Sequence, residues 1–304
     1  MNVFMFSGQG AQYVGMGKEL YDNFECAKKI FDQADQILGY SITSVLFENE
    51  EKLNDTLYTQ VAMFTLYAAI LEVLKEKSIE AEYTCGLSLG EYGAMYYAGV
   101  FDFETGLNLL VKRGLFMNQA SKKVEGKMSA IIGMDADLLL DIIKKTDGYV
   151  TIANYNTYGQ LVISGEEKAV LAVNEKALEL GARRAILLNT SGPFHTELMS
   201  EASEKLANYI SEIDFKVPNK KLLVNTTGDF FDGHVKENMT KQITSSVLFY
   251  QMIEKLIEKG VTNYIEIGPK STLCGFVKKV NKALNIVNVE DISSLEKTIS
   301  KLEE

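Results

Sequence analysis

The feature that most constrains the fold of this chain is a short apolar segment at residues 83–87. It runs into the pentapeptide GLSLG at residues 86–90 and then into a helical pattern over residues 89–98. The pentapeptide fits the G-x-S-x-G pattern, in which a serine occupies a sharp turn between a strand and a helix. Glycines flank the serine because neighbouring backbone approaches closely there. The segment therefore predicts a tight turn that exposes the hydroxyl of Ser88 at the N-terminus of a helix, where an anion is stabilised; a chance match in a loop is the alternative.

Strand and helix patterns alternate at the two ends of the chain. Strands are expected at residues 3–6, 83–87, 221–225 and 264–267, and helices from about residue 17 to 31 and at 61–74, 89–98, 197–212 and 246–259. Alternation of this kind predicts a mostly parallel α/β sheet.

The middle of the chain is built from shorter units. Strands are expected at residues 128–134, 150–154, 161–164 and 184–188, and helices at 138–143 and 167–180. The order βαββαβ is typical of a ferredoxin-like unit. We therefore predict a two-domain α/β protein, with a larger hydrolase-like α/β domain of residues 1–124 and 191–304 and an inserted smaller ferredoxin-like subdomain of residues 125–190.

Charge and cysteine content exclude several classes of function. The chain has 31 Lys plus Arg against 41 Asp plus Glu, a formal net charge of −10, so nucleic acid is not expected as a partner. Its three cysteines, Cys26, Cys85 and Cys274, form no C-x-x-C pair, so neither a disulfide framework nor a metal site is expected. Residues 1–6 form too short an apolar run for export or a membrane span. These features predict a cytoplasmic protein.

A serine nucleophile needs a neighbouring base, and the chain contains only two histidines. His234 lies in a polar run at residues 232–236, which indicates an exposed side chain. His195 lies in a loop after the small subdomain and is the candidate base; a structural loop histidine is the alternative. In α/β-hydrolases the histidine comes late in the chain, whereas a long stretch follows His195, so the order argues against a hydrolase.

Ordered motifs along nearly the whole chain resemble those of the malonyl-CoA:acyl carrier protein transacylase family. They are FSGQGAQ at residues 6–12, GLSLGEY at 86–92, KRG at 112–114 with Met117, NYN at 154–156, GPFH at 192–195 and EIGP at 266–269. That family also has the inserted βαββαβ unit.

The resemblance implies an acyl transfer in two steps. Ser88 would attack the thioester of malonyl-CoA while His195 takes its proton, and malonyl would then pass to the phosphopantetheine thiol of acyl carrier protein. The backbone N–H groups of Gln9 and Leu89 would bind the oxyanion. Malonyl-CoA is a substrate and no cofactor is implied; the pathway would be fatty acid or polyketide biosynthesis.

The resemblance also implies the residues that bind the substrate. Arg113 would hold the free carboxylate of malonyl through two charge-assisted bonds, and Met117 and Asn154 would lie beside the substrate. An uncharged acetyl group would leave the guanidinium unpaired. Without the motif, a solvated arginine beside Lys112 would be the simpler interpretation. Phe194 is expected to crowd the α-carbon and disfavour methylmalonyl.

Three positions depart from the family pattern. The family usually has histidine before the nucleophile, where this chain has Leu87, and proline where it has Ser7. Aligned on residues 245–248, a family glutamine falls on Leu248. The backbone carbonyl of Leu248 is therefore expected to orient His195, with no acidic third member of a triad.

The sequence leaves open where the carrier docks, and it also leaves open two other functions. Lys122, Lys123, Arg183 and Arg184 lie at the edges of the small subdomain and are candidates for a basic patch that docks an acidic carrier; scattered solvated charges are the alternative. A thioesterase or esterase could use the same serine turn. A carrier-binding scaffold without catalysis could have kept the fold.

Overall fold

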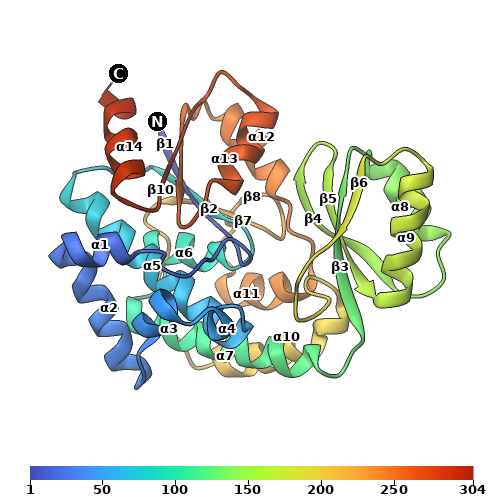
Figure 1. Ribbon diagram of the computed structural model, residues 1–304, viewed down its shortest axis with the longest axis horizontal. Coiled ribbons are helices and arrows are strands. Elements are labelled where there is room, and N and C mark those ends of the chain that lie inside the picture. The colour runs from blue at the N-terminus through green and yellow to red at the C-terminus, as the bar shows by residue number, and fades with distance from the viewer. Residues whose placement is uncertain (304) are drawn as a thin grey trace.

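The larger sheet of the protein has the strand order β10-β9-β1-β2-β7-β8. In this computed structural model, which describes residues 1–303, its strands are β1 (Asn2–Phe6), β2 (Tyr83–Gly86), β7 (Lys221–Val224), β8 (Asp229–Phe230), β9 (Asn263–Ile267) and β10 (Asn285–Val289). The neighbouring strands from β10 to β7 are parallel, and β8 pairs antiparallel with β7. The prediction of a mostly parallel α/β sheet is confirmed (Figure 1).

β1 lies in the middle of this sheet because its apolar run suits burial on both faces. Val3 and Met5 point into one apolar cluster, whereas Phe4 and Phe6 point into the other. This alternation follows from the two-residue period of a strand. Helices α12 (Phe249–Glu258) and α13 (Thr272–Val280) complete the cluster around Val3, and the remaining helices of the large unit complete the cluster around Phe4.

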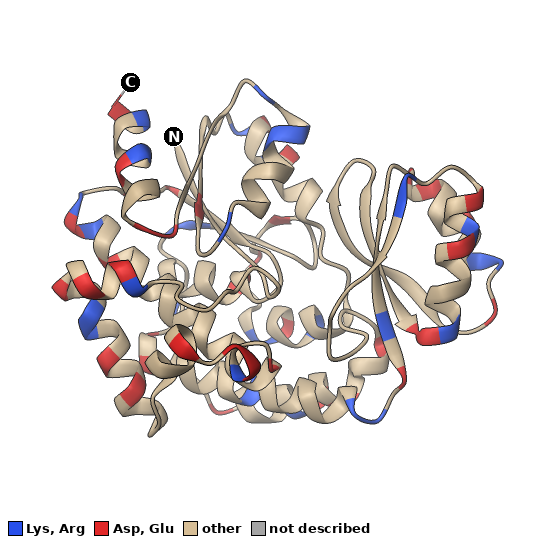
Figure 2. Ribbon diagram, viewed as in Figure 1, with Lys and Arg blue, Asp and Glu red and all other residues tan. Residues whose placement is uncertain are grey.

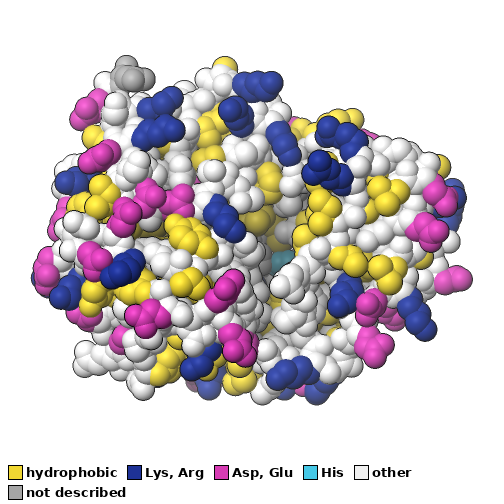
Figure 3. All heavy atoms as spheres, viewed as in Figure 1, with side chains coloured by type: hydrophobic (Ala, Val, Ile, Leu, Met, Phe, Trp, Pro, Cys, Tyr) yellow, Lys and Arg dark blue, Asp and Glu magenta, His cyan; other side chains and the backbone are white. Residues whose placement is uncertain are grey.

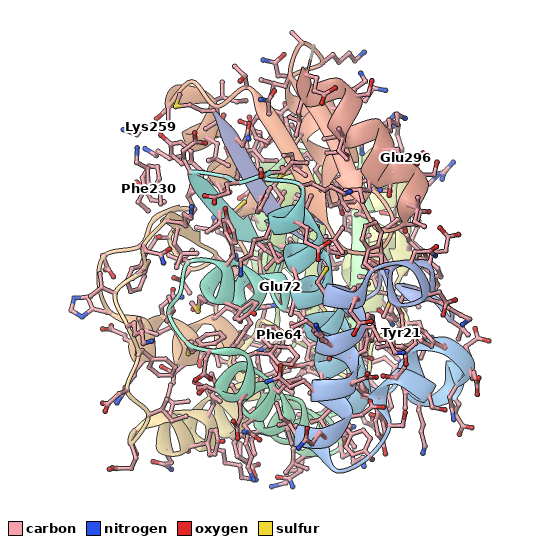
Figure 4. The ribbon with its side chains drawn as sticks, turned by 90° about the vertical axis from the view of Figure 1, so that its left-hand side faces the viewer. Tyr21, Phe64, Glu72, Phe230, Lys259 and Glu296 are labelled. Carbon is pink, nitrogen blue, oxygen red and sulfur yellow. The ribbon has the colours of Figure 1, made fainter. Side chains whose placement is uncertain are left out.

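α5 (Thr56–Glu76) and α7 (Phe103–Ser121) form the centre of the helical layer around Phe4. Gly106 of α7 allows close packing, since a Cβ added there would lie 2.4 Å from the ring of Phe64 in α5. Figure 4 shows Phe64 inside this layer. By length and composition α5 could cross a membrane, but 83% of its apolar window is buried inside the protein. It is therefore the central core helix of this layer.

The smaller sheet, at the right of Figure 1, is antiparallel and has the order β4-β5-β3-β6. Its elements are β3 (Gly126–Ile132), α8 (Ala136–Lys144), β4 (Val150–Thr157), β5 (Gln160–Glu166), α9 (Glu167–Glu179) and β6 (Arg184–Leu187). The two helices pack on one face around a separate apolar cluster. Met128, Ala153 and Val162 belong instead to the main core of the large unit. The predicted ferredoxin-like βαββαβ order is confirmed.

Several helices differ from the expected ranges or had no predicted counterpart. The helix expected from about residue 17 is two helices, α1 (Lys18–Asn23) and α2 (Glu25–Leu38), because the backbone of Phe24 is extended between them. The helix expected at 197–212 begins as a 3₁₀ turn, η1 (Glu197–Met199), before α10 (Ser200–Ile210). The other helices are α3 (Ile42–Glu48), α4 (Glu50–Leu53), α6 (Gly90–Tyr97), α11 (Val235–Thr244) and α14 (Ile292–Glu303).

The segment before α12 joins the two sheets. The N–H of Val247 donates to the carbonyl of Ala153 at 2.8 Å, and the N–H of Tyr155 donates to the carbonyl of Val247 at 2.9 Å. Asn154 and Val247 thus form a parallel bridge at the outer edge of β4. This bridge fixes the loop between α11 and α12 against the small sheet.

Candidate active site

Ser88 lies in the sharp turn between β2 and α6 that the sequence predicts. Its backbone has φ of 53°, in the left-handed region that side-chain-bearing residues rarely adopt. A Cβ added at Gly86 would lie 2.0 Å from the carbonyl carbon of Gly90, and one added at Gly90 would lie 2.1 Å from the carbonyl oxygen of Phe6. Glycine is therefore required at both positions, because the backbone of the turn packs closely against itself and against the end of β1.

His195 lies within hydrogen-bond distance of Ser88, although 107 residues separate them in the chain. Ser88 Oγ and His195 Nε2 are 2.7 Å apart. His195 Nδ1 lies 2.9 Å from the carbonyl oxygen of Gln242 and 3.1 Å from that of Ser245. Carbonyl oxygens can only accept, so Nδ1 carries the hydrogen and the lone pair of Nε2 faces Ser88.

Leu248 does not orient His195, and this prediction is wrong. Leu248 is the N-cap residue of α12, and its N–H donates to the carbonyl of Asn225 at 3.0 Å. The acceptors for Nδ1 come from the C-terminal end of α11, where Gln242 lies in the last turn and Ser245 follows it. The last carbonyls of a helix have no partner inside it, so they are free to accept from His195.

Gln242 is the site residue that the sequence analysis missed. Its Nε2 donates to the carbonyl of Ser88 at 3.0 Å, and its Oε1 accepts from Nη2 of Arg113 at 3.0 Å. Together with its main-chain bond to His195, this residue contacts all three predicted members of the site. Its sequence signal was weak, because the buried positions of α11, residues 238, 239, 242 and 243, include two polar side chains.

Arg113 lies on α7 with only 1% of its surface exposed, so it is not the solvated arginine of the alternative interpretation. Its Cζ is 5.1 Å from the ring centroid of Tyr92, and its Nε has no hydrogen-bond partner in the described part of the chain. Glu91 contributes an opposite charge nearby, but within residues 1–303 Arg113 forms no ion pair. Burial lowers the pKa of Arg113. A buried guanidinium with unused donors is a site for an incoming anion.

Burial sets the charge of the two other ionisable groups in the site. His195 is 4% exposed, and burial together with the charge of Arg113 lowers its pKa to about 4. Burial raises the pKa of Glu91 to about 7, although its hydrogen-bond donors and Arg113 act in the opposite direction. His195 is therefore neutral at pH 7, which is the state that a general base requires.

The predicted oxyanion donors follow the ends of two adjacent strands. Gln9 follows β1, and Leu89 directly follows Ser88. A Cβ added at Gly8 would lie 2.9 Å from the carbonyl oxygen of Leu87, so the two turns are in contact. Within the described residues 1–303, neither the N–H of Gln9 nor that of Leu89 donates a hydrogen bond. Both groups are thus available to a ligand, and their role stays a prediction.

The other predicted substrate residues are buried. Met117 is one helical turn beyond Arg113 on α7, and its sulfur accepts from Nε2 of Gln60 at 3.5 Å. Phe194 precedes His195 and packs into the main apolar cluster. Asn154 lies on β4, at the bridge to the segment before α12. Figure 3 shows a groove between the two units, with a histidine side chain at its floor and apolar side chains along its walls. The roles of these three residues stay predictions.

The basic residues predicted to dock a carrier are exposed on the small unit and its border. Lys123 forms an ion pair with Glu201 at 2.7 Å, so part of its charge is already compensated. Within residues 1–303, Lys122, Arg183 and Arg184 form no ion pair. Figure 2 shows acidic and basic residues interspersed over the small unit. Lys122, Arg183 and Arg184 are therefore better candidates than Lys123. His234 is exposed at the start of α11, as predicted.

The chain is similar to known proteins over almost its whole length. The family model of the acyl transferase domain matches residues 3–301. The malonyl CoA-acyl carrier protein transacylase of Bacillus subtilis (strain 168) is 43% identical, covering 99% of this chain and 97% of its own length. A crystal structure of the transacylase of that name from Clostridium perfringens superimposes with a TM-score of 0.96 at 44% identity, covering 99% of this chain and 97% of the other.

A third similar structure contains a partner. It is a type II PKS acyl-carrier protein in complex with its malonyl-transacylase, with a TM-score of 0.95 and 32% identity, and covers 98% of this chain and 99% of the other.

Proposed function

The chain belongs to the acyl transferase domain family and, within it, to the malonyl CoA-acyl carrier protein transacylases, and from this premise we propose how it transfers malonyl. Malonyl moves from malonyl-CoA to the phosphopantetheine thiol of acyl carrier protein through an ester on Ser88. The observation that carries this proposal is the 2.7 Å contact of Ser88 Oγ with a histidine nitrogen that bears a lone pair. Fatty acid or polyketide biosynthesis would use the product.

In the first half-reaction, Ser88 Oγ attacks the thioester carbonyl while His195 Nε2 takes the hydroxyl proton. The backbone N–H groups of Gln9 and Leu89 are free to stabilise the oxyanion that forms. When the carbon–sulfur bond breaks, His195 returns the proton to the CoA thiolate. In the second half-reaction the carrier thiol gives its proton to His195 and attacks the ester, and Ser88 then regains a proton.

Arg113 binds the free carboxylate of malonyl in this proposal. Nη2 is held by Gln242, while Nε has no hydrogen-bond partner among residues 1–303. A carboxylate that accepts from the unused donors compensates a charge that is otherwise buried without an ion pair. Selection for malonyl over acetyl follows, because acetyl has no group that can accept from Arg113.

A mass measurement on the intact protein tests the function. With malonyl-CoA alone we expect one malonyl adduct, absent in Ser88→Ala, that moves to the thiol of added carrier protein. Steady release of malonate without the carrier would instead indicate a thioesterase. A protein that binds the carrier and never forms an adduct would be a scaffold and would contradict the proposal.

The pH at which kcat/KM falls on the acid side should lie far below the pKa of an ordinary histidine, which is about 6.5. Burial and Arg113 lower the pKa of His195 to about 4, so Nε2 keeps its lone pair as the pH falls from 7 to about 5. We expect kcat/KM for adduct formation to fall only as the pH drops through about 4.

The histidine itself can be followed by NMR. In His234→Asn the ring protons of His195 stand alone, because the chain has only two histidines. They should titrate with the same midpoint as the rate, in protein whose circular dichroism stays native. A midpoint near 6.5 for both would contradict the lowered pKa of His195, and a rate midpoint that differs from that of its ring protons would contradict the assignment of the base.

The carrier docks on the basic edge of the small unit in this proposal. Reversing Arg183 and Arg184 to Glu is expected to raise KM for the carrier several-fold, because opposite charges speed and orient the encounter. KM for malonyl-CoA should not change. Reversing the exposed pair Lys28 and Lys29 on α2 changes the net charge equally and serves as the control. Equal effects of Arg183 and Arg184 on both substrates would remove the proposal.

The proposed location is a reducing compartment such as the cytoplasm. All three cysteines are free thiols, and Cys85 is buried in the large sheet. A protein whose cysteines are all reduced does not depend on disulfides for its stability, so it can function in such a compartment.

A further inference from the structure

A buried polar network lies directly beneath the serine turn. Asn225, which follows β7, has no exposed surface. Its Oδ1 accepts from the N–H of Ser88 at 2.7 Å, and its Nδ2 donates to the carbonyl of Gly86 at 2.6 Å. A single side-chain amide therefore holds the backbone both at the serine and two residues before it.

Asn225 is in turn fixed by Glu91, the first acidic residue of α6. Glu91 has no exposed surface, and its Oε2 accepts from the N–H of Asn225 at 2.5 Å. Its Oε1 accepts from Nδ2 of Asn238 on α11 at 2.6 Å, and Asn238 accepts in turn from Thr226 at 2.6 Å. Glu91 thus connects α6, the helix after Ser88, to Asn225 at the end of β7 and to Asn238 on α11.

The network determines which backbone donors stay free. The N–H of Ser88 is taken by Asn225, so it cannot serve an oxyanion. The N–H of Leu89 has no acceptor within residues 1–303 and is left for the ligand. Because Ser88 has φ of 53°, its turn also needs support from outside to persist.

We infer that Asn225 and Glu91 are positioning residues for the nucleophile: they hold Ser88 in its left-handed turn, with its hydroxyl toward His195 and the N–H of Leu89 toward the oxyanion. This inference rests on the proposed function. Within residues 1–303 neither side chain forms a hydrogen bond or an ion pair with Arg113, although Glu91 contributes an opposite charge near it. The network therefore sets the rate of acylation, and the choice of acyl group, which Arg113 makes, is tested on Asn225.

The test is the single-turnover rate of malonyl-enzyme formation in Asn225→Ala. We expect this rate to fall roughly tenfold to a hundredfold, as displacement of a reacting group by about 1 Å does. The half-saturating malonyl-CoA concentration and the preference for malonyl over acetyl should change by less than about twofold. Asn174→Ala, which truncates a buried asparagine on α9 of the small unit, is the matched control and should acylate at the native rate.

Glu91 supplies a second test that does not depend on the folding of Asn225→Ala. Glu91→Ala should lose rate in the same way, and Glu91→Gln should recover most of it. The oxygen of the new glutamine can still accept from the N–H of Asn225. Its NH₂ group can donate to Oδ1 of Asn238 once the amide of Asn238 has flipped. The flipped NH₂ group of Asn238 then donates to the hydroxyl oxygen of Thr226. A merely structural role would lower the unfolding temperature and the rate together and would not separate rate from half-saturation.

The outcomes separate this inference from the proposed function. Native acylation rates in folded Asn225→Ala or Glu91→Ala would overturn the inference and leave the function standing. Rates that fall equally in Asn174→Ala would also overturn it. Absence of an adduct in the unmodified protein would sink the proposed function itself.

Discussion

Replacing His195 by alanine is expected to lower kcat/KM for malonyl-CoA by about 10⁴-fold or more, comparable with removal of one member of a serine catalytic triad. Nε2 of His195 is the group 2.7 Å from Ser88 Oγ, and without it the hydroxyl must lose its proton to water. The rate of adduct formation measured by quenched-flow mass spectrometry gives this loss directly. His234→Ala removes the other, exposed histidine and should leave the rate unchanged.

Ser88→Ala should be as inactive as the double variant with His195→Ala. The two side chains act as a unit, and effects within such a unit are not additive. An adduct that forms in His195→Ala at the native rate would contradict the role of the base.

Replacing Arg113 by alanine is expected to reverse the preference between acyl groups. A hydrogen bond to a charged group contributes about 1.5–3 kcal/mol, so the loss of two to malonyl should lower its kcat/KM about a hundredfold or more. Acetyl-CoA makes no bond to Arg113 and should react as fast or faster. The ratio of the two kcat/KM values, measured in competition, should therefore fall by at least about a hundredfold.

Two further variants sharpen the test of Arg113. Arg113→Lys keeps the charge but cannot bind a carboxylate as a planar fork while it also bonds to Gln242, so it should restore malonyl transfer only in part. Lys112→Ala removes the adjacent cation, which lies 5.7 Å over the ring of Tyr209, and should leave the ratio unchanged. A parallel fall for malonyl and acetyl in Arg113→Ala would mean that the residue supports the fold alone.

Local sequence patterns predicted the parts of the fold whose signal lies within one segment. The apolar run of β1, the turn at Ser88 and the βαββαβ order are of this kind. α11 was missed because its sequence, VKENMTKQIT, has only three apolar residues, and its buried face is completed by Asn238 and Gln242. Polar side chains that are buried by a network give no apolar period, so the pattern resembles a solvated loop.

The contact of Ser88 with His195 could not be obtained from spacing, because the fold brings together residues far apart in the chain. The order of family motifs supplied it. Leu248 was chosen from a match of four residues, which cannot report where a helix ends. The end of α11 at Thr244, and not the motif, decides which carbonyls stay open to His195.

Ser88 and His195 share an unusual backbone conformation, with φ of 53° and 61°. A residue with a side chain adopts that region at a cost of about 1–2 kcal/mol, a cost that glycine avoids. The chain thus has a serine and a histidine at positions where conformational ease alone would favour glycine. Glycine at either position would relieve that strain, but at position 195 it would also empty a buried site and leave the carbonyls of Gln242 and Ser245 without their donor, so the backbone strain is kept where the reaction takes place.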